Sequence, residues 1–147
     1  MYQKILLPTD GSKLSKKAMV NAIAMAKLCA AELVVVNVVP RYPMSYFEGA
    51  VPLAPNDISK IEASWTASGQ TVVDGVAKAA AAKGVATKTV VVRGDVVSDA
   101  VLATAKKYKC DLIIMASHGR KGIKRLLLGS ETQHVLTHAT IPVLILK

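Results

Sequence analysis

The sequence predicts an α/β fold in which one domain is built on a five-stranded parallel sheet with helices on both faces. Its 147 residues match the usual size of one compact domain. Hydrophobic residues make up 52% of the chain but aromatic residues only 4%, so Ala, Val, Leu and Ile must form the core. Short apolar runs alternate with helical patterns along the chain, which indicates parallel strands joined by right-handed crossovers.

The first strand is expected at residues 4–8 (KILLP), a short apolar run closed by turn-forming residues. A helix is expected at residues 13–30, with Ser12 as its N-cap. Apolar residues recur there every three or four positions, which is typical of a helix with one buried face. The residues of that face are Leu14, Ala18, Ala22, Met25, Ala26 and Cys29.

The second strand, residues 32–39, is a nearly continuous run of valine, as expected where helices cover both faces of a parallel strand. Pro40 ends it. Residues 41–56 carry several prolines and a glycine among scattered aromatic residues, which predicts an irregular excursion. We interpret this segment as a candidate lid or partner contact.

The second helix is expected at residues 58–83, weakened at Gly69 and Gly75, with Gly84 as its C-terminal cap. The alternation then continues to the end of the chain. The remaining elements are a strand at 87–92, a helix at 97–108, a strand at 111–116, a helix at 130–138 and a strand at 142–146. The third helix is expected to face inward through Val97, Val101, Leu102 and Ala105.

The sequence also predicts where in the cell the protein is located. Its N-terminus has no apolar signal region, and no run approaches the roughly 20 apolar residues that span a bilayer, so no membrane association and a cytoplasmic location are expected. Cys29 and Cys110 form no CxxC motif, which fits two unrelated thiols in a reducing compartment.

The formal net charge of +9 favours phosphate-bearing ligands of any kind, although many lysines fall on predicted helix surfaces where solvation is the ordinary expectation. The charge alone does not separate a nucleotide from a nucleic acid. The basic residues are not interleaved with an aromatic stacking platform, which makes nucleic-acid binding the weaker hypothesis.

Two strand exits have the composition of a ligand site: residues 8–12 (PTDGS) and residues 116–120 (ASHGR). If the first and fourth strands are neighbours at the switch point of the sheet, both loops face a common crevice. Asp10 would then bond a ribose hydroxyl or an adenine amine. The alternative is that Asp10 only caps the helix that follows.

Gly129 precedes the fourth helix, whose free backbone N–H groups and dipole can hold an anion. Gly119 and Gly129 would let the backbone approach phosphates closely, and the hydroxyls of Ser117 and Ser130 could add hydrogen bonds. Ser130 with Gln133 also fits a capping box, so simple helix capping stays open for Ser130.

The stretch ASHGRKGIKRLLLGSETQHVLTHATIPVLIL resembles the C-terminal signature of the universal stress protein family. In ATP-binding members of that family the pattern is glycine, two residues, glycine, nine residues, then glycine with Ser or Thr. Gly119, residues 120–128, Gly129 and Ser130 match it, whereas the first glycine falls on Ala116. Two outcomes stay open there: the extra methyl group is tolerated, because alanine is small and lies at a strand end, or it narrows the space for a phosphate or ribose. The N-terminal ILLPTDGS resembles the first strand and nucleotide-contacting loop of the family, so the resemblance spans nearly the whole chain.

This resemblance implies an adenine-nucleotide-hydrolase-like sheet with strand order 3-2-1-4-5. It also implies ATP, or else AMP or ADP, as the ligand, with Mg²⁺ as the accompanying ion. The base and ribose would be surrounded by Pro8, Thr9, Asp10 and Val38. The phosphates would be surrounded by Ala116, Ser117, Gly119, Arg120, Gly129, Ser130 and Glu131.

No GxxxxGK loop and no nucleophile elbow occurs in the sequence, so catalysis is expected to be absent or limited to slow ATP hydrolysis. His134 and His138 have a spacing that can chelate a metal, but no third ligand is evident, so we assign no metal site there.

The leading hypothesis is a nucleotide-responsive protein in which ATP orders residues 41–56 and 117–128 and so alters the surface for an unknown protein partner. The alternative is a dimeric interaction protein that binds no nucleotide, which the alanine at position 116 favours. An apolar edge strand is hazardous unless another copy covers it, and the family resemblance likewise implies a homodimer through residues 142–146.

Overall fold

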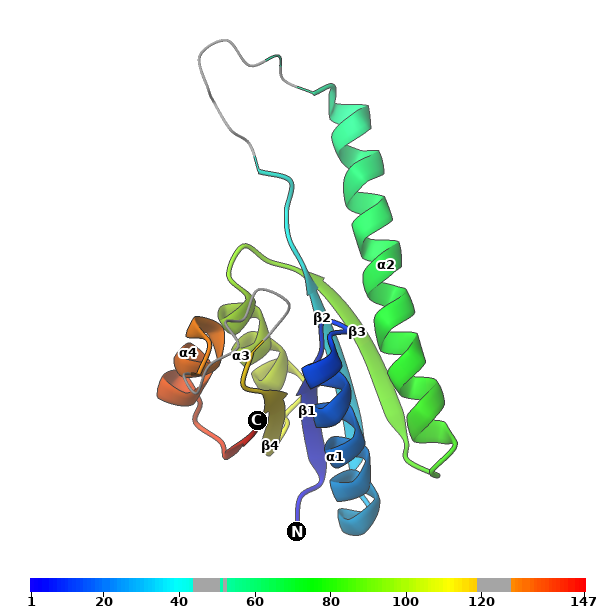
Figure 1. The fold of residues 1–147 in the computed structure, drawn as a ribbon, viewed down its shortest axis with the longest axis vertical. Coiled ribbons are helices and arrows are strands. Elements are labelled where there is room, and N and C mark those ends of the chain that lie inside the picture. Colours follow the sequence, from blue (N-terminus) through cyan, green and yellow to red (C-terminus); the bar gives the residue numbers. More distant parts are fainter. Residues whose placement is uncertain (44–50, 52, 119–127) are drawn as a thin grey trace.

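A computed structural model gives the structure of the protein and describes residues 1–43, 51, 53–118 and 128–147 (Figure 1). Strands and helices alternate along these residues as the sequence predicts. In chain order the elements are β1 (Lys4–Pro8), α1 (Lys13–Cys29), β2 (Glu32–Val39), α2 (Pro55–Ala81), β3 (Thr87–Arg93), α3 (Val97–Lys107), β4 (Leu112–Ala116), α4 (Ser130–His138) and β5 (Val143–Leu146).

All neighbouring strands of the sheet run parallel, in the order β3-β2-β1-β4-β5. The predicted fold class and strand order are therefore confirmed. Ile5 of β1 lies opposite Leu33 of β2 on one side and Leu112 of β4 on the other. The chain is wound outward from β1 in one direction through β2 and β3, and in the other through β4 and β5. The topological switch point thus lies between β1 and β4.

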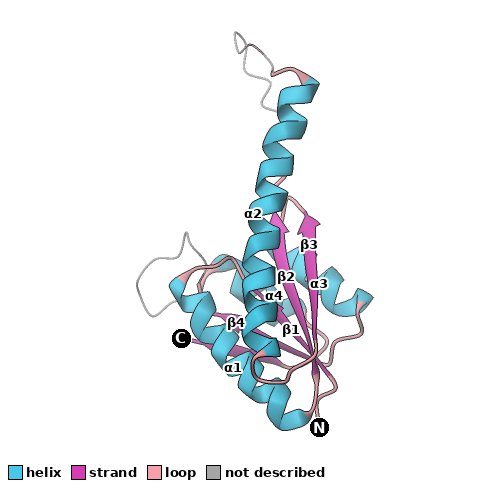
Figure 2. Ribbon diagram, turned by 90° about the vertical axis from the view of Figure 1, so that its right-hand side faces the viewer, coloured by secondary structure: helices cyan, strands magenta, loops and turns pink. Residues whose placement is uncertain are grey.

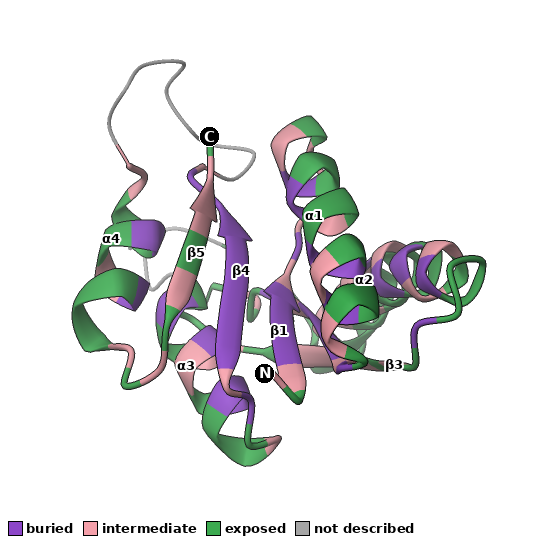
Figure 3. Ribbon diagram, turned by 90° about the horizontal axis from the view of Figure 1, so that it is seen from below, coloured by how far each residue is buried: buried purple, intermediate pink, exposed green. Residues whose placement is uncertain are grey.

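The core consists of one apolar cluster on each face of the sheet. Side chains alternate between the two faces along a strand, so Ile5 and Leu7 join one cluster while Leu6 joins the other. Helices α1 and α2 cover the first face, and α3 and α4 cover the second (Figure 3). Burial on both faces explains the valine-rich sequence of β2.

The predicted N-cap of α1 is confirmed, whereas the predicted C-terminal cap Gly84 is wrong, because the C-cap of α2 is Ala82. Ser12 is the N-cap of α1, because its Oγ accepts a hydrogen bond from the Ser15 N–H at 3.2 Å. Helix α2 begins at Pro55, before the predicted residue 58, since proline fits the first turn of a helix. Gly84 has a left-handed φ of 75° in the turn that follows α2. Within the described ranges, no helix has both the length and the apolar character needed to cross a membrane.

The prediction that Val97 faces the core is wrong, because its side chain is 43% exposed. It is the first residue of α3, and the buried face of that helix instead begins at Ser98, which is 1% exposed. The face continues through Val101, Thr104 and Ala105. Two of its members are polar, so a pattern based on hydrophobic residues alone placed the face one position too early.

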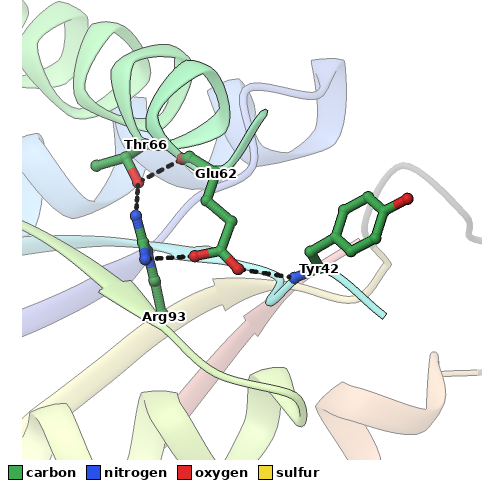
Figure 4. A network of polar contacts seen from close by, with 4 residues as sticks. All are labelled: Tyr42, Glu62, Thr66 and Arg93. Atoms are coloured by element: carbon green, nitrogen blue, oxygen red, sulfur yellow. Dashed lines mark hydrogen bonds and ion pairs between the residues drawn. The ribbon is translucent and has the colours of Figure 1, made fainter. Parts of the chain in front are cut away.

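Helix α2 extends well past the carboxyl ends of β2 and β3 (Figures 1 and 2). A polar network attaches this part of the helix to the sheet (Figure 4). Arg93 at the end of β3 pairs with Glu62, whose other oxygen accepts a hydrogen bond from the Tyr42 N–H at 3.3 Å. The ring of Tyr42 stacks on Trp65 with a centroid separation of 6.2 Å. The chain leaving β2 is therefore fixed to α2; residues 44–50 and 52 of the predicted irregular segment lie outside the described residues.

Candidate functional site

The two loops selected from the sequence leave the same edge of the sheet. β1 pairs directly with β4, with Leu6 opposite Ile113, so the chain after Pro8 and the chain after Ala116 emerge side by side. This is the switch point, where sheets of this kind bind their ligands.

Hydrogen bonds hold the N–H, the carbonyl and the hydroxyl of Thr9. Its N–H donates to Val36 O at 2.9 Å, and its carbonyl accepts from the side-chain amide of Asn37 at 2.9 Å. Its hydroxyl donates to Ser15 Oγ at 3.2 Å and accepts from the Gly11 N–H at 3.3 Å. Thr9 is buried, so its side chain acts mainly by holding the turn that carries the next residue.

Asp10 follows directly on this fixed residue and is partly exposed. Its Oδ1 accepts a hydrogen bond from the Ser12 N–H at 2.9 Å, which closes a tight turn through Gly11 at a φ of 77°. The carboxylate therefore supports the helix entry, as the capping alternative required, although the N-cap itself is Ser12. Its assignment to a ribose or adenine group stays a prediction.

Ser117 and Gly129 are brought into contact although they are far apart in the sequence. The Gly129 N–H donates to Ser117 O at 2.9 Å, and the Ser117 N–H donates to Leu146 O at 2.8 Å. The Ser117 hydroxyl is also in hydrogen-bond contact with His118 Nδ1 at 2.9 Å. These bonds place the start of α4 against the end of β4. Gly119 and Arg120, the other predicted phosphate contacts of this loop, lie outside the described residues.

The close approach favours a glycine at position 129. A Cβ there would lie 3.3 Å from Ser117 O, which is tighter than ordinary van der Waals contact. Gly129 is the N-cap of α4, and Ser130 is the first helical residue. The backbone N–H groups of the first turn of a helix lack intrahelical partners and attract anions. The start of α4 therefore lies at the end of β4, the strand that pairs with β1.

The alternative capping box of Ser130 and Gln133 is not formed. The start of α4 has no side-chain cap at Gly129, and the Gln133 amide instead donates to Leu128 O at 2.9 Å. Ser130 is exposed at the first helical position. The sequence pattern placed the N-cap at Ser130, one residue after the actual N-cap Gly129, because glycine also serves as an N-cap.

Glu131 makes a contact that the sequence did not indicate. Its Oε2 accepts a hydrogen bond from the Ser98 N–H of α3 at 2.6 Å, so the side chain caps a neighbouring helix. Its predicted place among the phosphate contacts would therefore fall to its backbone N–H, in the first turn of α4.

Thr132 is a further residue that sequence reasoning missed. Its buried hydroxyl lies 3.2 Å from Ala116 O and 3.1 Å from Ser117 O, so it connects α4 to the end of β4. The signal available in the sequence was a polar residue three positions before the buried Val135, on the inward face of α4.

Ala116 and Val38 lie at the ends of their strands and belong to opposite clusters. Ala116 is 8% exposed and packs in the cluster beneath α1 and α2, so its methyl group is part of the core. Val38 is partly buried against the other cluster. The methyl group of Ala116 thus occupies the core beneath the helices.

His134 contacts Asp99 of α3 at 3.1 Å, and its ring stacks on His138 with a centroid separation of 4.1 Å. Across the described parts of the chain, no cluster of three or more His, Cys, Asp or Glu side chains is arranged to hold a metal ion. These histidines therefore take part in contacts between and within helices.

Five parallel strands in this order, with a fixed turn after β1 and a glycine-opened helix beside β4, define a doubly wound α/β domain whose ligand position is the switch point. A model of the universal stress protein family matches residues 1–147. The universal stress protein MJ0531 of Methanocaldococcus jannaschii is 37% identical over 149 residues, which cover 100% of this chain and 83% of that protein. The chain belongs to the universal stress protein family.

Solved structures are similar over almost the full chain. The universal stress protein MJ0577 of the same organism is 28% identical, with a TM-score of 0.84 over 100% of this chain and 96% of that one. A universal stress protein in complex with cAMP is 26% identical, with a TM-score of 0.72 over 99% and 97% of the two chains. The fold predicted from the resemblance is thus found in proteins of the same family.

Proposed function

We propose that this universal stress protein binds an adenine nucleotide, ATP together with Mg²⁺, at the carboxyl ends of β1 and β4, and that it works as a nucleotide-responsive dimeric switch. The observation that carries the proposal is the 2.9 Å hydrogen bond from the Gly129 N–H to Ser117 O. It sets the amide-rich start of α4 beside the exit of β4, next to the turn that carries Asp10.

The phosphates would bind at the start of α4. The N–H groups of Ser130, Glu131 and Thr132 belong to the first turn, and the helix dipole favours negative charge there. The hydroxyls of Ser117 and Ser130, with Gly119 and Arg120 from the connecting loop, would complete this side. A net charge of +9 also favours a polyphosphate over an uncharged ligand.

The base and ribose would bind on the β1 and β2 side, against Pro8, Thr9, Asp10 and Val38. Hydrogen bonds already fix the turn around Asp10, so little conformational entropy would be lost on binding. The related protein in complex with cAMP supports an adenine nucleotide as the ligand of this fold. The burial of the Ala116 methyl group in the core supports a ligand position that this methyl group does not fill.

Dimerisation would involve the edge strand β5. Within the described part of the chain it pairs with β4 alone, and its Leu144 is 39% exposed. An apolar edge of this kind favours pairing with a second copy through residues 142–146. Nucleotide binding would then change the surface offered to a protein partner.

Isothermal titration calorimetry with ATP, ADP and AMP, each with and without Mg²⁺, tests the proposal. We expect saturable binding, tightest for ATP with Mg²⁺. A mass spectrum of small molecules released from the purified protein provides a second readout, in which copurified ATP or AMP is expected. Absence of binding heat and of thermal stabilisation with all three nucleotides would remove the proposal.

A second candidate function is a dimeric interaction protein without a nucleotide, which the exposed apolar edge of β5 favours by itself. Calorimetry combined with sedimentation separates the two. A dimer that binds none of the three nucleotides would support this candidate, whereas a nucleotide-binding dimer supports the leading proposal.

A further inference from the structure

Asn37 occupies an unusual position near the end of β2, where a polar amide interrupts a run of valines. Its Nδ2 donates a hydrogen bond to Thr9 O at 2.9 Å. Its Oδ1 lies so close to Gly69 of α2 that a Cβ on that glycine would be only 2.6 Å away. The amide is therefore held between the backbone of α2 and the carbonyl of Thr9.

The Thr9 carbonyl belongs to the peptide unit that joins Thr9 to Asp10. A planar peptide whose oxygen is fixed has little freedom to rotate, so the direction in which Asp10 leaves the chain is fixed as well. The two neighbouring anchors are the Thr9 N–H bonded to Val36 O and the Asp10 carboxylate bonded to the Ser12 N–H, both at 2.9 Å. Between these two hydrogen bonds, Asn37 holds the carbonyl of the peptide that joins Thr9 to Asp10.

We infer that Asn37 is a positioning residue of the nucleotide site, which orients Asp10 toward the ribose or base through the Thr9 carbonyl. This inference rests on the proposed function. Gly69 is part of the same device, because only a residue without a Cβ lets α2 lie over the Asn37 amide without displacing it. The packing of α2 on the sheet is thereby linked to the affinity of the site for the adenosine part of its ligand.

Few other side chains could replace Asn37 and still donate a hydrogen bond to the Thr9 carbonyl. An aspartate has the same shape but presents an oxygen to the Thr9 oxygen and cannot donate. A leucine of similar volume leaves the carbonyl without its donor. A glutamine is longer by one methylene group and would have to fit beside Gly69, which lies so close that a Cβ on it would be 2.6 Å from the Asn37 Oδ1.

The test compares Asn37→Asp and Asn37→Leu with the wild type and with the control Asn21→Asp. Asn21 also donates its amide to a backbone carbonyl, Lys17 O at 3.0 Å, but on the exposed side of α1. Calorimetry would measure the Kd values of ATP, 2′-deoxy-ATP, 3′-deoxy-ATP, ITP and inorganic tripolyphosphate. The last ligand probes the phosphate side alone, and ITP lacks the adenine amine.

We expect the wild type to prefer ATP over at least one of the three nucleotide analogues. In both Asn37 variants the affinity for ATP should fall about tenfold, as for the loss of one good hydrogen bond. The ratio of the Kd of the disfavoured analogue to the Kd of ATP should fall toward one. Tripolyphosphate should bind as in the wild type, which a general loosening of the fold would not allow. Asn21→Asp should behave as the wild type throughout.

Gly69→Ala provides a second route that leaves β2 unchanged and keeps the inference testable if the Asn37 variants fail to fold. It should displace the Asn37 amide and reduce the same preference, whereas Gly75→Ala, which meets no atom within 4 Å, should not. Three outcomes would overturn the positioning role alone. They are folded variants that still distinguish ATP from its analogues as the wild type does, a loss of tripolyphosphate affinity equal to the loss of ATP affinity, and a wild type that does not prefer ATP over any analogue. A wild type that binds no nucleotide would overturn the proposed function and this inference with it.

Discussion

The carboxylate of Glu131 on α4 accepts a hydrogen bond from the backbone N–H of Ser98 on α3 at 2.6 Å. The N-cap residue of α3 is Val96, whose side chain cannot bond the free N–H groups of the first turn. Glu131 supplies that cap from another helix, and its negative charge is favoured by the α3 dipole. One residue further along α3, Asp99 contacts His134 at 3.1 Å. The start of α4, where phosphates are proposed to bind, is thus fixed to α3.

Replacing Glu131 should lower stability through the loss of this cap. We expect Glu131→Ala to reduce the free energy of unfolding by about 1 kcal/mol, and Glu131→Gln to reduce it less, since an amide oxygen can still accept the bond. Urea denaturation would measure both. Glu32→Ala is the control, because Glu32 makes an exposed ion pair with Lys4 at 3.5 Å and its loss should change stability little. Equal effects at the two glutamates would contradict the capping role.

Gly129→Ala should weaken nucleotide binding more than it weakens the fold. The new Cβ would lie 3.3 Å from Ser117 O and, on the proposed function, beside the phosphates. Because Gly129 has a φ of −60°, alanine meets no backbone strain there, and we expect a stability loss of about 1 kcal/mol or less from the poorer N-cap. Calorimetry with ATP should show a loss of about tenfold or more for this variant. Wild-type affinity in Gly129→Ala would place the phosphates away from the start of α4.

The two glycines inside α2 should respond in opposite ways to alanine. Gly75→Ala meets no atom within 4 Å and should stabilise the protein by about 0.5–1 kcal/mol, the usual gain in a helix. Gly69→Ala would set a Cβ 2.6 Å from Asn37 Oδ1 and 3.1 Å from Val39 Cγ2, so we expect it to be about 1–3 kcal/mol less stable than Gly75→Ala. Thermal unfolding of both variants would decide, and equal stabilisation would mean that α2 is not closely packed at Gly69.

Much of the fold could be predicted because its signals are local. The valine run of β2, the apolar spacing of α1 and the Ser12 cap each depend on residues that are neighbours in sequence. In an α/β chain these local signals also limit the topology, since parallel strands need crossover helices. The strand order, with β1 beside β4, was implied by the family resemblance rather than by these local signals, and the structure confirms it.

What the sequence did not predict depends on pairs that only the folded chain brings together. Nothing local connects Glu131 to Ser98, Asn37 to Thr9, or Thr132 to the carbonyl of Ala116. The error at Ser130 has a different origin, because two helix-capping patterns fit the sequence one residue apart. The structure distinguishes them, because Gly129 has the extended backbone of an N-cap and its carbonyl accepts a hydrogen bond from the Gln133 N–H at 3.0 Å.

The two cysteines should differ in reactivity at alkaline pH. The pKa of the Cys110 thiol is raised from 9.0 to about 11, chiefly by burial; Lys4 opposes this rise, while Asp111 and Glu32 add to it. Because the thiolate is the reactive form, iodoacetamide at pH 8.5 should label the partly buried Cys29 well before Cys110, as peptide mass spectrometry would show. An unfolded chain would ionise this thiol at lower pH than the folded one, so Cys110 should also make stability fall as pH rises from about 9 to 11. Cys110→Ala should flatten that decline, and similar labelling rates for the two thiols would contradict the prediction.

The edge strand β5 permits a direct test of the dimer. It lies at the margin of the sheet, where its outer side has no neighbouring strand among the described residues (Figure 3). Leu144→Lys would add a charge to an apolar edge, a feature that proteins use to prevent edge-to-edge pairing. We expect sedimentation at micromolar concentration to show a dimer for the wild type and a monomer for Leu144→Lys. Leu28→Lys is the control: Leu28 is an 83% exposed leucine near the end of α1 and is not part of β5, so this variant should stay dimeric. If β5 formed the interface, the added lysine of each copy would lie near its counterpart and repel it. A dimer that persists in Leu144→Lys would therefore exclude β5 as the interface.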